Sequence, residues 1–339
     1  MVGAAGARRD GATVASQAVL LPTETDAPRV LGMVKAAYAP AGGFDELQES
    51  VLAGIAHSLY GLDLADVPVA NDDTVAHATQ EERLHAVHLM VVLEFVEHPL
   101  STRVELPVEE YAHGLGVSLT LLRDARKLAK GHFAWMYLDL QRHSWYEEET
   151  IRESVRGRWE ELIRSKLAYT GVVSDHVIAK KWSSLRDCPA GSWGKAVADF
   201  YDRHGFPFPG ERYGIYELGA RHDWVHVLAG YETTPEGELD VFAFIASSMK
   251  DQRGLVLLAI TLGLFQNGSI HHVAGKKIEI ARADTLTDDG AVDRWVEAFR
   301  RGSLATTDVM GTVRLFEHKN DPIDEARARF GVVPLRAGL

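Results

Sequence analysis

The chain has 339 residues, of which 46% are hydrophobic and 25% charged, which is the composition of a globular protein with one large or two ordinary domains. Its formal net charge of −12 excludes a broad nucleic-acid surface, because phosphate binding needs clustered Lys and Arg. The single cysteine, Cys188, excludes an intramolecular disulfide and a thiolate-rich zinc cluster, so any metal must rely on His and carboxylates in a reducing cytoplasm.

The chain opens with a segment that carries no structural signal, and helical signals follow it. Residues 1–25 are Gly/Ala-rich at their start and lack the apolar run of a signal peptide, so we expect a disordered leader. Residues 44–62 place apolar side chains at helical spacing, with Asp45 near the start and Gly61 near the end. This pattern predicts an amphipathic helix.

Further helices are predicted along the first half and into the second. Residues 79–98 begin with Thr79-x-x-Glu82, the pattern of a capping box, and end before Pro99. Three more segments have helical spacing: residues 107–116, 118–145 and 150–171. No stretch alternates polar and apolar residues between hairpin turns, so the sequence predicts an all-α, multi-helix bundle.

We expect two helical parts, an N-terminal bundle over residues 26–147 and a C-terminal domain over 148–339. The most apolar run, residues 255–265, is too short to cross a bilayer, and we interpret it as a buried helix. The protein is therefore expected to be soluble and cytoplasmic, with membrane contact that is peripheral at most.

The segment RHDWVHVLAGYETTPEGELDVF, residues 221–242, carries the pattern most typical of a metal site. His222 and His226 are four residues apart, which places both imidazoles on one face of a helix, within reach of one cation. The Gly and Pro residues that follow should turn the chain, so that Glu238 opens the next helix and faces the histidines. The alternative is an ordinary buried helix, whose imidazoles would still need polar partners.

Asp223 stands where helical H-E-x-x-H metalloproteases have glutamate. It is predicted to be either a metal ligand or a general base, and we name Asp223 and His222 as candidate catalytic residues. We expect His222, Asp223, His226 and Glu238 to bind one divalent metal ion. Zinc is the first candidate, and iron, manganese and cobalt are alternatives. Tyr231 and Glu232 follow the histidine helix and are expected to orient the ligands from outside.

Four elements in order resemble a known family: residues 188–206, 222–244, 294–302 and 321–334. The family is that of coenzyme Q biosynthesis protein 4, and the resemblance covers residues 183–334. Its signature is His-Asp-x-x-His, eleven residues and Glu, which this chain reproduces from His222 to Glu238. The family domain is usually a complete protein, whereas here a long N-terminal extension precedes it, in which we find no catalytic motif.

The resemblance implies an all-α fold with a hydrophobic cavity for an isoprenoid or quinone-type ligand. It also implies removal of a ring carboxylate, with hydroxylation at that carbon, on a quinone-like, prenylated or other aromatic natural-product substrate. As partners we expect a hydrophobic or isoprenoid substrate, and either a second copy of the chain or a biosynthetic complex. Two alternatives stay open, a non-catalytic lipid- or quinone-binding scaffold and a zincin-like hydrolase.

Other histidines are weaker candidates. Glu82, His85 and His88 share a helical face, but di-metal bundles need a second Glu-x-x-His helix and two more Glu, so we interpret this face as solvated. The adjacent pair His271 and His272 is interpreted as lying in a loop. His204 is expected in a Gly/Pro turn before a helix that carries two tyrosines, Tyr213 and Tyr216.

Overall fold

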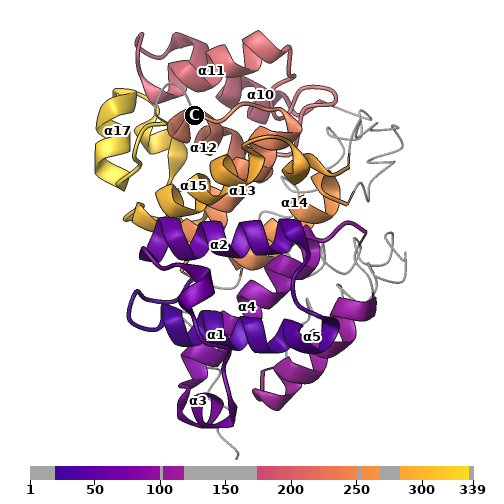
Figure 1. Cartoon of the computed structure of the whole chain (residues 1–339). Coiled ribbons are helices and arrows are strands. Elements are labelled where there is room, and N and C mark those ends of the chain that lie inside the picture. The colour runs from indigo at the N-terminus through magenta and orange to yellow at the C-terminus, as the bar shows by residue number, and fades with distance from the viewer. Residues whose placement is uncertain (1–19, 100–101, 118–173, 251–252, 268–282, 336–339) are drawn as a thin grey trace, which may run out of the picture.

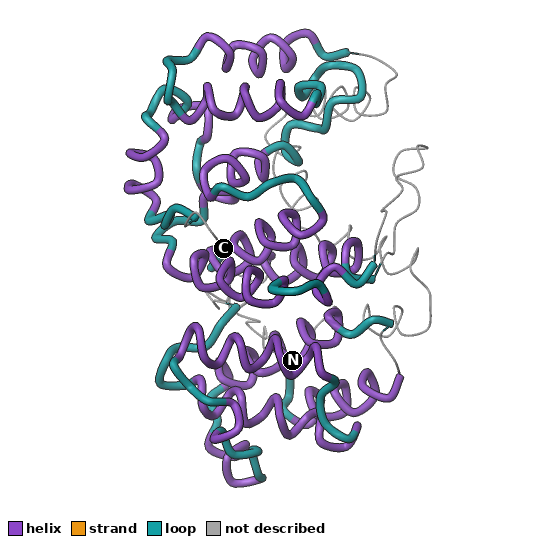
Figure 2. The backbone as a smooth tube through the Cα atoms, turned by 45° about the horizontal axis from the view of Figure 1, so that its top comes forward, coloured by secondary structure: helices purple, strands orange, loops and turns teal. Residues whose placement is uncertain are grey.

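The computed structural model describes residues 20–99, 102–117, 174–250, 253–267 and 283–335. Within these ranges the prediction of an all-α protein is confirmed: thirteen α-helices alternate with loops and short 3-10 turns, and no strand is present (Figure 2). The predicted helices 118–145 and 150–171, the boundary at residue 147, the first 19 residues of the leader and the pair His271–His272 lie outside the described residues.

The helices fall into two groups along the chain. The first group comprises α1 (Ala27–Tyr38), α2 (Glu46–Tyr60), α3 (Asp72–His77), α4 (Gln80–Val96) and α5 (Thr102–Gly114). The second comprises α10 (His176–Ser183), α11 (Trp193–His204), α12 (Arg221–Ala229), α13 (Pro235–Ser248), α14 (Arg253–Phe265), α15 (Ala291–Leu304), α16 (Val309–Thr312) and α17 (Ile323–Phe330). Figure 1 shows the first group below the second.

The predicted starts of two helices are confirmed by their capping bonds. At α2, the Asp45 carboxylate accepts the Gln48 N–H, and the Gln48 side chain accepts the Asp45 N–H. Thr79 and Glu82 form the same reciprocal pair at α4. Gly61 ends α2 in the left-handed conformation, which glycine adopts without a steric cost.

The start of α5 differs from the prediction. The helix begins at Thr102 rather than at residue 107, and Pro107 lies inside it. Proline forfeits one backbone hydrogen bond there. Val104 and Val108 on either side of the proline are fully buried, so tertiary packing outweighs the local preference of proline for a helix start.

The helix α4 is the centre of the first group, packed against α1, α2, α5 and the second-group helix α14. Every residue from His85 to Val96 is buried. Leu20 and Leu21, in the last part of the predicted leader, are buried against the same core.

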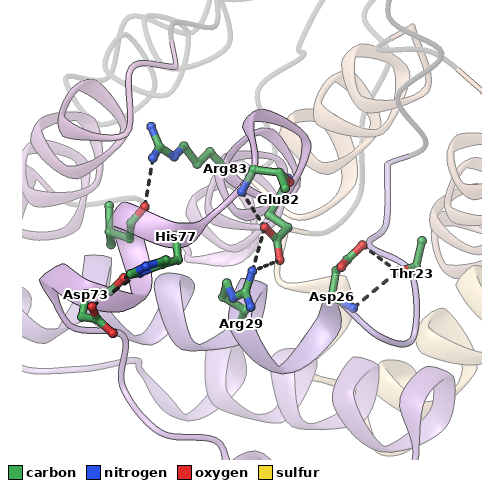
Figure 3. A network of polar contacts seen from close by, with 9 residues as sticks. Thr23, Asp26, Arg29, Asp73, His77, Glu82 and Arg83 are labelled. Atoms are coloured by element: carbon green, nitrogen blue, oxygen red, sulfur yellow. Dashed lines mark hydrogen bonds and ion pairs between the residues drawn. The ribbon is translucent and has the colours of Figure 1, made fainter.

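Glu82 ties the start of α4 to its neighbours (Figure 3). Its carboxylate accepts the Thr79 N–H at 2.6 Å and a bond from the Arg29 guanidinium of α1 at 2.8 Å. The next residue, Arg83, donates to the Val75 carbonyl of α3. These contacts join three helices of the first group at one point.

The two groups share one hydrophobic core. The helix α2 packs on α15, and α4 packs on α14. At the end of α14, the Gln266 amide donates to the Val96 carbonyl and the Asn267 amide donates to the Phe95 carbonyl. Those carbonyls lie in the last turn of α4 and lack helical partners, so the side chains of one group cap a helix of the other.

The predicted buried helix over residues 255–265 is confirmed as α14, which packs against α13 and α4. Among the described residues, no helix combines the length and apolar character that crossing a bilayer requires. Within the second group α13 lies between α14 and α15, and it also contacts α12. The packing of α13 on both sides holds it in place against α12, and the candidate site lies between these two helices.

Candidate metal centre

A sharp turn between α12 and α13 brings their polar residues together. Gly230 ends α12 at a φ of 85°, in the left-handed region, and Thr234 caps the start of α13. A Cβ atom at Gly237 would lie 2.0 Å from the Glu232 carbonyl oxygen, so only glycine fits this turn. Glu238 therefore lies in the first turn of α13 and faces back towards α12, as the sequence pattern predicts.

The structure brings His222, His226 and Glu238 together, with one ligand atom from each lying within 4.8 Å of the others. The His226 Nε2 atom is 3.3 Å from Glu238 Oε1, and the His222 Nε2 atom is 3.9 Å from Glu238 Oε2. Ligands at about 2.0–2.2 Å from a tetrahedral zinc ion are roughly 3.3 Å apart. The three groups therefore fit the requirements of one small divalent ion.

Hydrogen bonds to main-chain carbonyls orient both imidazoles. His222 Nδ1 donates to the Gly219 carbonyl at 2.6 Å, and His226 Nδ1 donates to the Tyr231 carbonyl at 3.3 Å. Each ring therefore directs Nε2 towards Glu238, and although burial opposes this, Glu238 raises the pKa of His226. A bound cation would take the place of the Nε2 proton. Histidines that bind metals are held in this way, with the outer nitrogen donating to a carbonyl or carboxylate.

The site is largely buried, and its charges are coupled. The His226 side chain is fully buried, while those of His222, Asp223 and Glu238 are 13%, 10% and 18% exposed. Burial raises the pKa of Glu238, but the charges of the two histidines outweigh it and the net pKa is lowered. The carboxylate is thus anionic at neutral pH, as a cation site requires.

Asp223 lies at the edge of this group. Its Oδ1 atom is 3.2 Å from His222 Nε2, but Asp223 is not among the residues whose ligand atoms all lie within 4.8 Å of one another. Its other oxygen, Oδ2, accepts a hydrogen bond from the Tyr201 hydroxyl of α11. Burial raises the pKa of Asp223, against the opposing effects of His222 and Tyr201. Both predicted roles, fourth ligand and base, stay predictions.

Aromatic rings pack against both imidazoles. Phe200 stacks on His226, with ring centroids 5.9 Å apart, and Phe242 stacks on His222 at 5.5 Å. Nothing in the sequence distinguishes these two phenylalanines, because a phenylalanine on an apolar helix face is far more often ordinary core. Their rings restrict the rotation of the two candidate ligands.

The two residues that follow α12 differ in their relation to the site. Tyr231 contacts the candidate ligand His226 through its main-chain carbonyl, while its ring lies under the Arg301 guanidinium. Glu232 is exposed and lies 3.7 Å from His204 Nε2. Of the pair, Tyr231 therefore orients a candidate ligand, whereas Glu232 pairs with His204.

The interpretation of Glu82, His85 and His88 as a solvated face is wrong, because all three residues are buried. They lie on α4, which packs against α1, α2, α5 and α14, and the His85 and His88 ring centroids are 6.2 Å apart. Glu82 is occupied by its bonds to Arg29 and to the cap of α4. Within the described residues, these three do not form a ligand group like that of α12 and α13.

Burial of His88 predicts a dependence of stability on pH. Burial, and then the neighbouring His85, lower the pKa of His88 from 6.5 to about 3. Between these pH values the unfolded chain binds a proton that the folded chain does not, so stability falls as the pH falls from 6.5 to about 3. Between pH 6.5 and about 3, the unfolding free energy of the wild type should fall by roughly a few kcal/mol more than that of His88→Leu.

Urea unfolding of the wild type and His88→Leu at several pH values measures this effect. Replacing the exposed His77 by leucine is the matched control, and its curve should follow that of the wild type. Parallel curves for His88→Leu and the wild type would show that His88 does not contribute to the acid sensitivity.

The segment after α11 also differs from the prediction. His204 is the last residue of α11, Tyr213 lies in a turn and Tyr216 lies in a loop, so neither tyrosine is on a helix. Tyr213 has a φ of 68°, and a Cβ atom at Gly214 would lie 2.0 Å from the Phe208 carbonyl oxygen. This tight turn is incompatible with a helix through both tyrosines.

No known family model matches this chain, and no curated protein is significantly similar to it. The likeness to the coenzyme Q biosynthesis protein 4 family therefore stays a prediction that rests on the quoted motifs. The helices α11, α12 and α13 and the side chains that they bring together are what points to a function.

Proposed function

We propose that this chain is a metal-dependent enzyme that acts on the ring of a hydrophobic, quinone-like, prenylated or other aromatic substrate. The reaction class is removal of a ring carboxylate with hydroxylation at that carbon, which comes from the resemblance of residues 183–334. One observation carries the proposal of a metal. Both imidazoles donate Nδ1–H to main-chain carbonyls and direct Nε2 at Glu238.

The roles of the residues follow from this arrangement. His222, His226 and Glu238 would hold the ion, which when bound supplies Lewis acidity at a substrate oxygen. Asp223, with one oxygen held by Tyr201, supplies its second oxygen beside His222, either as a fourth ligand or as the acceptor of a substrate proton. The phenylalanine rings on both histidines keep the imidazoles in place and exclude water from their faces.

The choice of metal limits the reaction. Hydroxylation by oxygen needs electrons, which the substrate would supply, either as the bond pair left on the ring when carbon dioxide leaves or as a hydroquinone. A redox-active ion would pass them to oxygen, whereas zinc cannot. Iron, manganese and cobalt are therefore alternatives to zinc. We propose that the protein acts in the cytoplasm, in contact with a membrane that holds its hydrophobic substrate.

Turnover by the full-length chain tests this function. The protein is loaded separately with zinc, iron(II), manganese and cobalt, then incubated with a prenylated aromatic hydroxycarboxylate, and loss of the ring carboxylate is followed by mass spectrometry. We expect turnover with at least one metal. Asp223→Ala should lower the rate by about 10²–10⁴-fold if it acts as the base. His77→Gln, an exposed histidine in α3, should retain the rate.

Other outcomes would replace the proposal with its alternatives. Binding of the prenylated probe without turnover under any metal would indicate a scaffold. Cleavage of generic peptides that hydroxamate chelators block would indicate a zincin-like hydrolase. Wild-type rates in Asp223→Ala and His226→Ala together would show that this site does not carry the reaction.

A further inference from the structure

A buried tyrosine contacts the edge of the candidate metal centre. Tyr201 lies on α11 and is 1% exposed, and its hydroxyl donates to Asp223 Oδ2. The ring of Phe208 stacks on the Tyr201 ring at a centroid distance of 4.9 Å, and that of Trp182 lies 5.8 Å away. The tyrosine is thus fixed by rings on more than one side, and its hydroxyl has little freedom to move away from the carboxylate.

The backbone positions of the two residues are fixed as well. The helix α11 packs on α12, and the indole nitrogen of Trp193 in α11 donates to the Trp224 carbonyl in α12 at 3.1 Å. Trp224 immediately follows Asp223 in the chain. Tyr201 and Asp223 therefore meet in a register that a buried hydrogen bond between the helices maintains.

Because of this contact, the two carboxylate oxygens of Asp223 have different neighbours. Oδ2 is occupied by the Tyr201 hydroxyl, while Oδ1 lies 3.2 Å from His222 Nε2. That separation is close to the roughly 3.3 Å between two ligands of one tetrahedral ion. Asp223 lies outside the group whose ligand atoms are all within 4.8 Å of one another, so a bound ion would have to draw Oδ1 inwards. A carboxylate without the tyrosine could rotate and present either oxygen, or both.

We propose that Tyr201 is a positioning residue, whose hydroxyl holds Asp223 so that Oδ1 alone faces the ion held by His222, His226 and Glu238. The inference rests on the proposed metal site and adds to it the residue that selects the fourth ligand atom. It makes Asp223 a ligand through one oxygen. The tyrosine itself does not touch the ion.

Metal binding by Tyr201→Phe tests the inference. The phenylalanine retains the packed ring and removes only the donor. We expect the zinc affinity, measured by competition with a chromogenic chelator, to fall about tenfold, as for other partners that orient metal ligands. The visible spectrum of the cobalt-loaded protein should change as well, because the coordination of the carboxylate changes.

Tyr38→Phe is the matched control. Tyr38 is also fully buried and its hydroxyl donates to the Met90 carbonyl, but it lies in the first group of helices. Both variants lose one buried hydroxyl bond, so they should lose similar stability, yet only Tyr201→Phe should change the affinity and the cobalt spectrum. In an Asp223→Ala background, Tyr201→Phe should cause no additional loss of affinity.

The outcomes separate this inference from the proposed function. Wild-type affinity and spectrum in Tyr201→Phe would overturn the inference while leaving the metal site intact. An equal further loss in the Asp223→Ala background would also overturn it, since Tyr201 would then act through packing alone. Absence of stoichiometric metal in the wild type overturns both. Should Tyr201→Phe not fold, Asp223→Asn is the second test: its carbonyl can still accept the Tyr201 hydroxyl, but its NH2 group then faces the ion and cannot bind it. An unchanged affinity there contradicts the inference.

Discussion

Replacing His226 with alanine is expected to abolish stable metal binding. His226 is fully buried, and its Nε2 atom makes no well-aligned hydrogen bond in the described structure although Glu238 lies 3.3 Å away. An ion between the two residues would satisfy both. Loss of an outer partner lowers metal affinity about 10–100-fold, so loss of a ligand should exceed that range.

Equilibrium dialysis and chelator competition measure this affinity in the full-length protein. Circular dichroism must accompany them, because removing a buried imidazole also leaves a cavity and a less well paired Glu238. His77→Ala changes an exposed histidine of α3 and should retain full affinity. If folded His226→Ala binds zinc as tightly as the wild type, the ion is held elsewhere.

The second large effect is expected in the packing of α13 against α15. A Cβ atom at Gly302 would lie 2.2 Å from the Phe244 carbonyl oxygen and 2.1 Å from Ser247 Oγ. Alanine is intrinsically better than glycine in a helix by about 1 kcal/mol, but here the backbones must separate. We expect Gly302→Ala to destabilise the protein by about 3 kcal/mol in spite of this gain.

Chemical unfolding of Gly302→Ala and of a matched variant checks this prediction. Gly114, the last residue of α5, has no atom within 4 Å of an added Cβ, so Gly114→Ala should be neutral or slightly stabilising. Because α13 also carries Glu238, Gly302→Ala should weaken metal binding too. Equal unfolding midpoints for both variants would contradict the close packing of the two helices.

The sequence predicts those features whose causes are local. The caps at Asp45 and Thr79 and the turn at Gly230 are fixed by bonds within a few residues, and each is found where its pattern lies. The start of α5 and the burial of His88 depend on packing between distant helices, which periodicity does not contain. Those two predictions were wrong for that reason.

In the candidate site too, the features with local causes could be predicted and those that depend on packing could not. The spacing of His222, His226 and Glu238 places them together through one helix face and one turn, both of which are local. The acceptors that orient the imidazoles are main-chain carbonyls, which leave no trace in the residue types. Tyr201 is 22 residues before Asp223 and reaches it only because α11 packs on α12.

Anomalous diffraction from crystals of the zinc-loaded, full-length chain shows whether His222, His226 and Glu238 hold one ion. We expect one strong peak at the zinc edge, about 2.0–2.2 Å from His222 Nε2, His226 Nε2 and a Glu238 oxygen. A well-ordered site without such a peak, or with Glu238 turned away and the zinc bound to other residues, would contradict it.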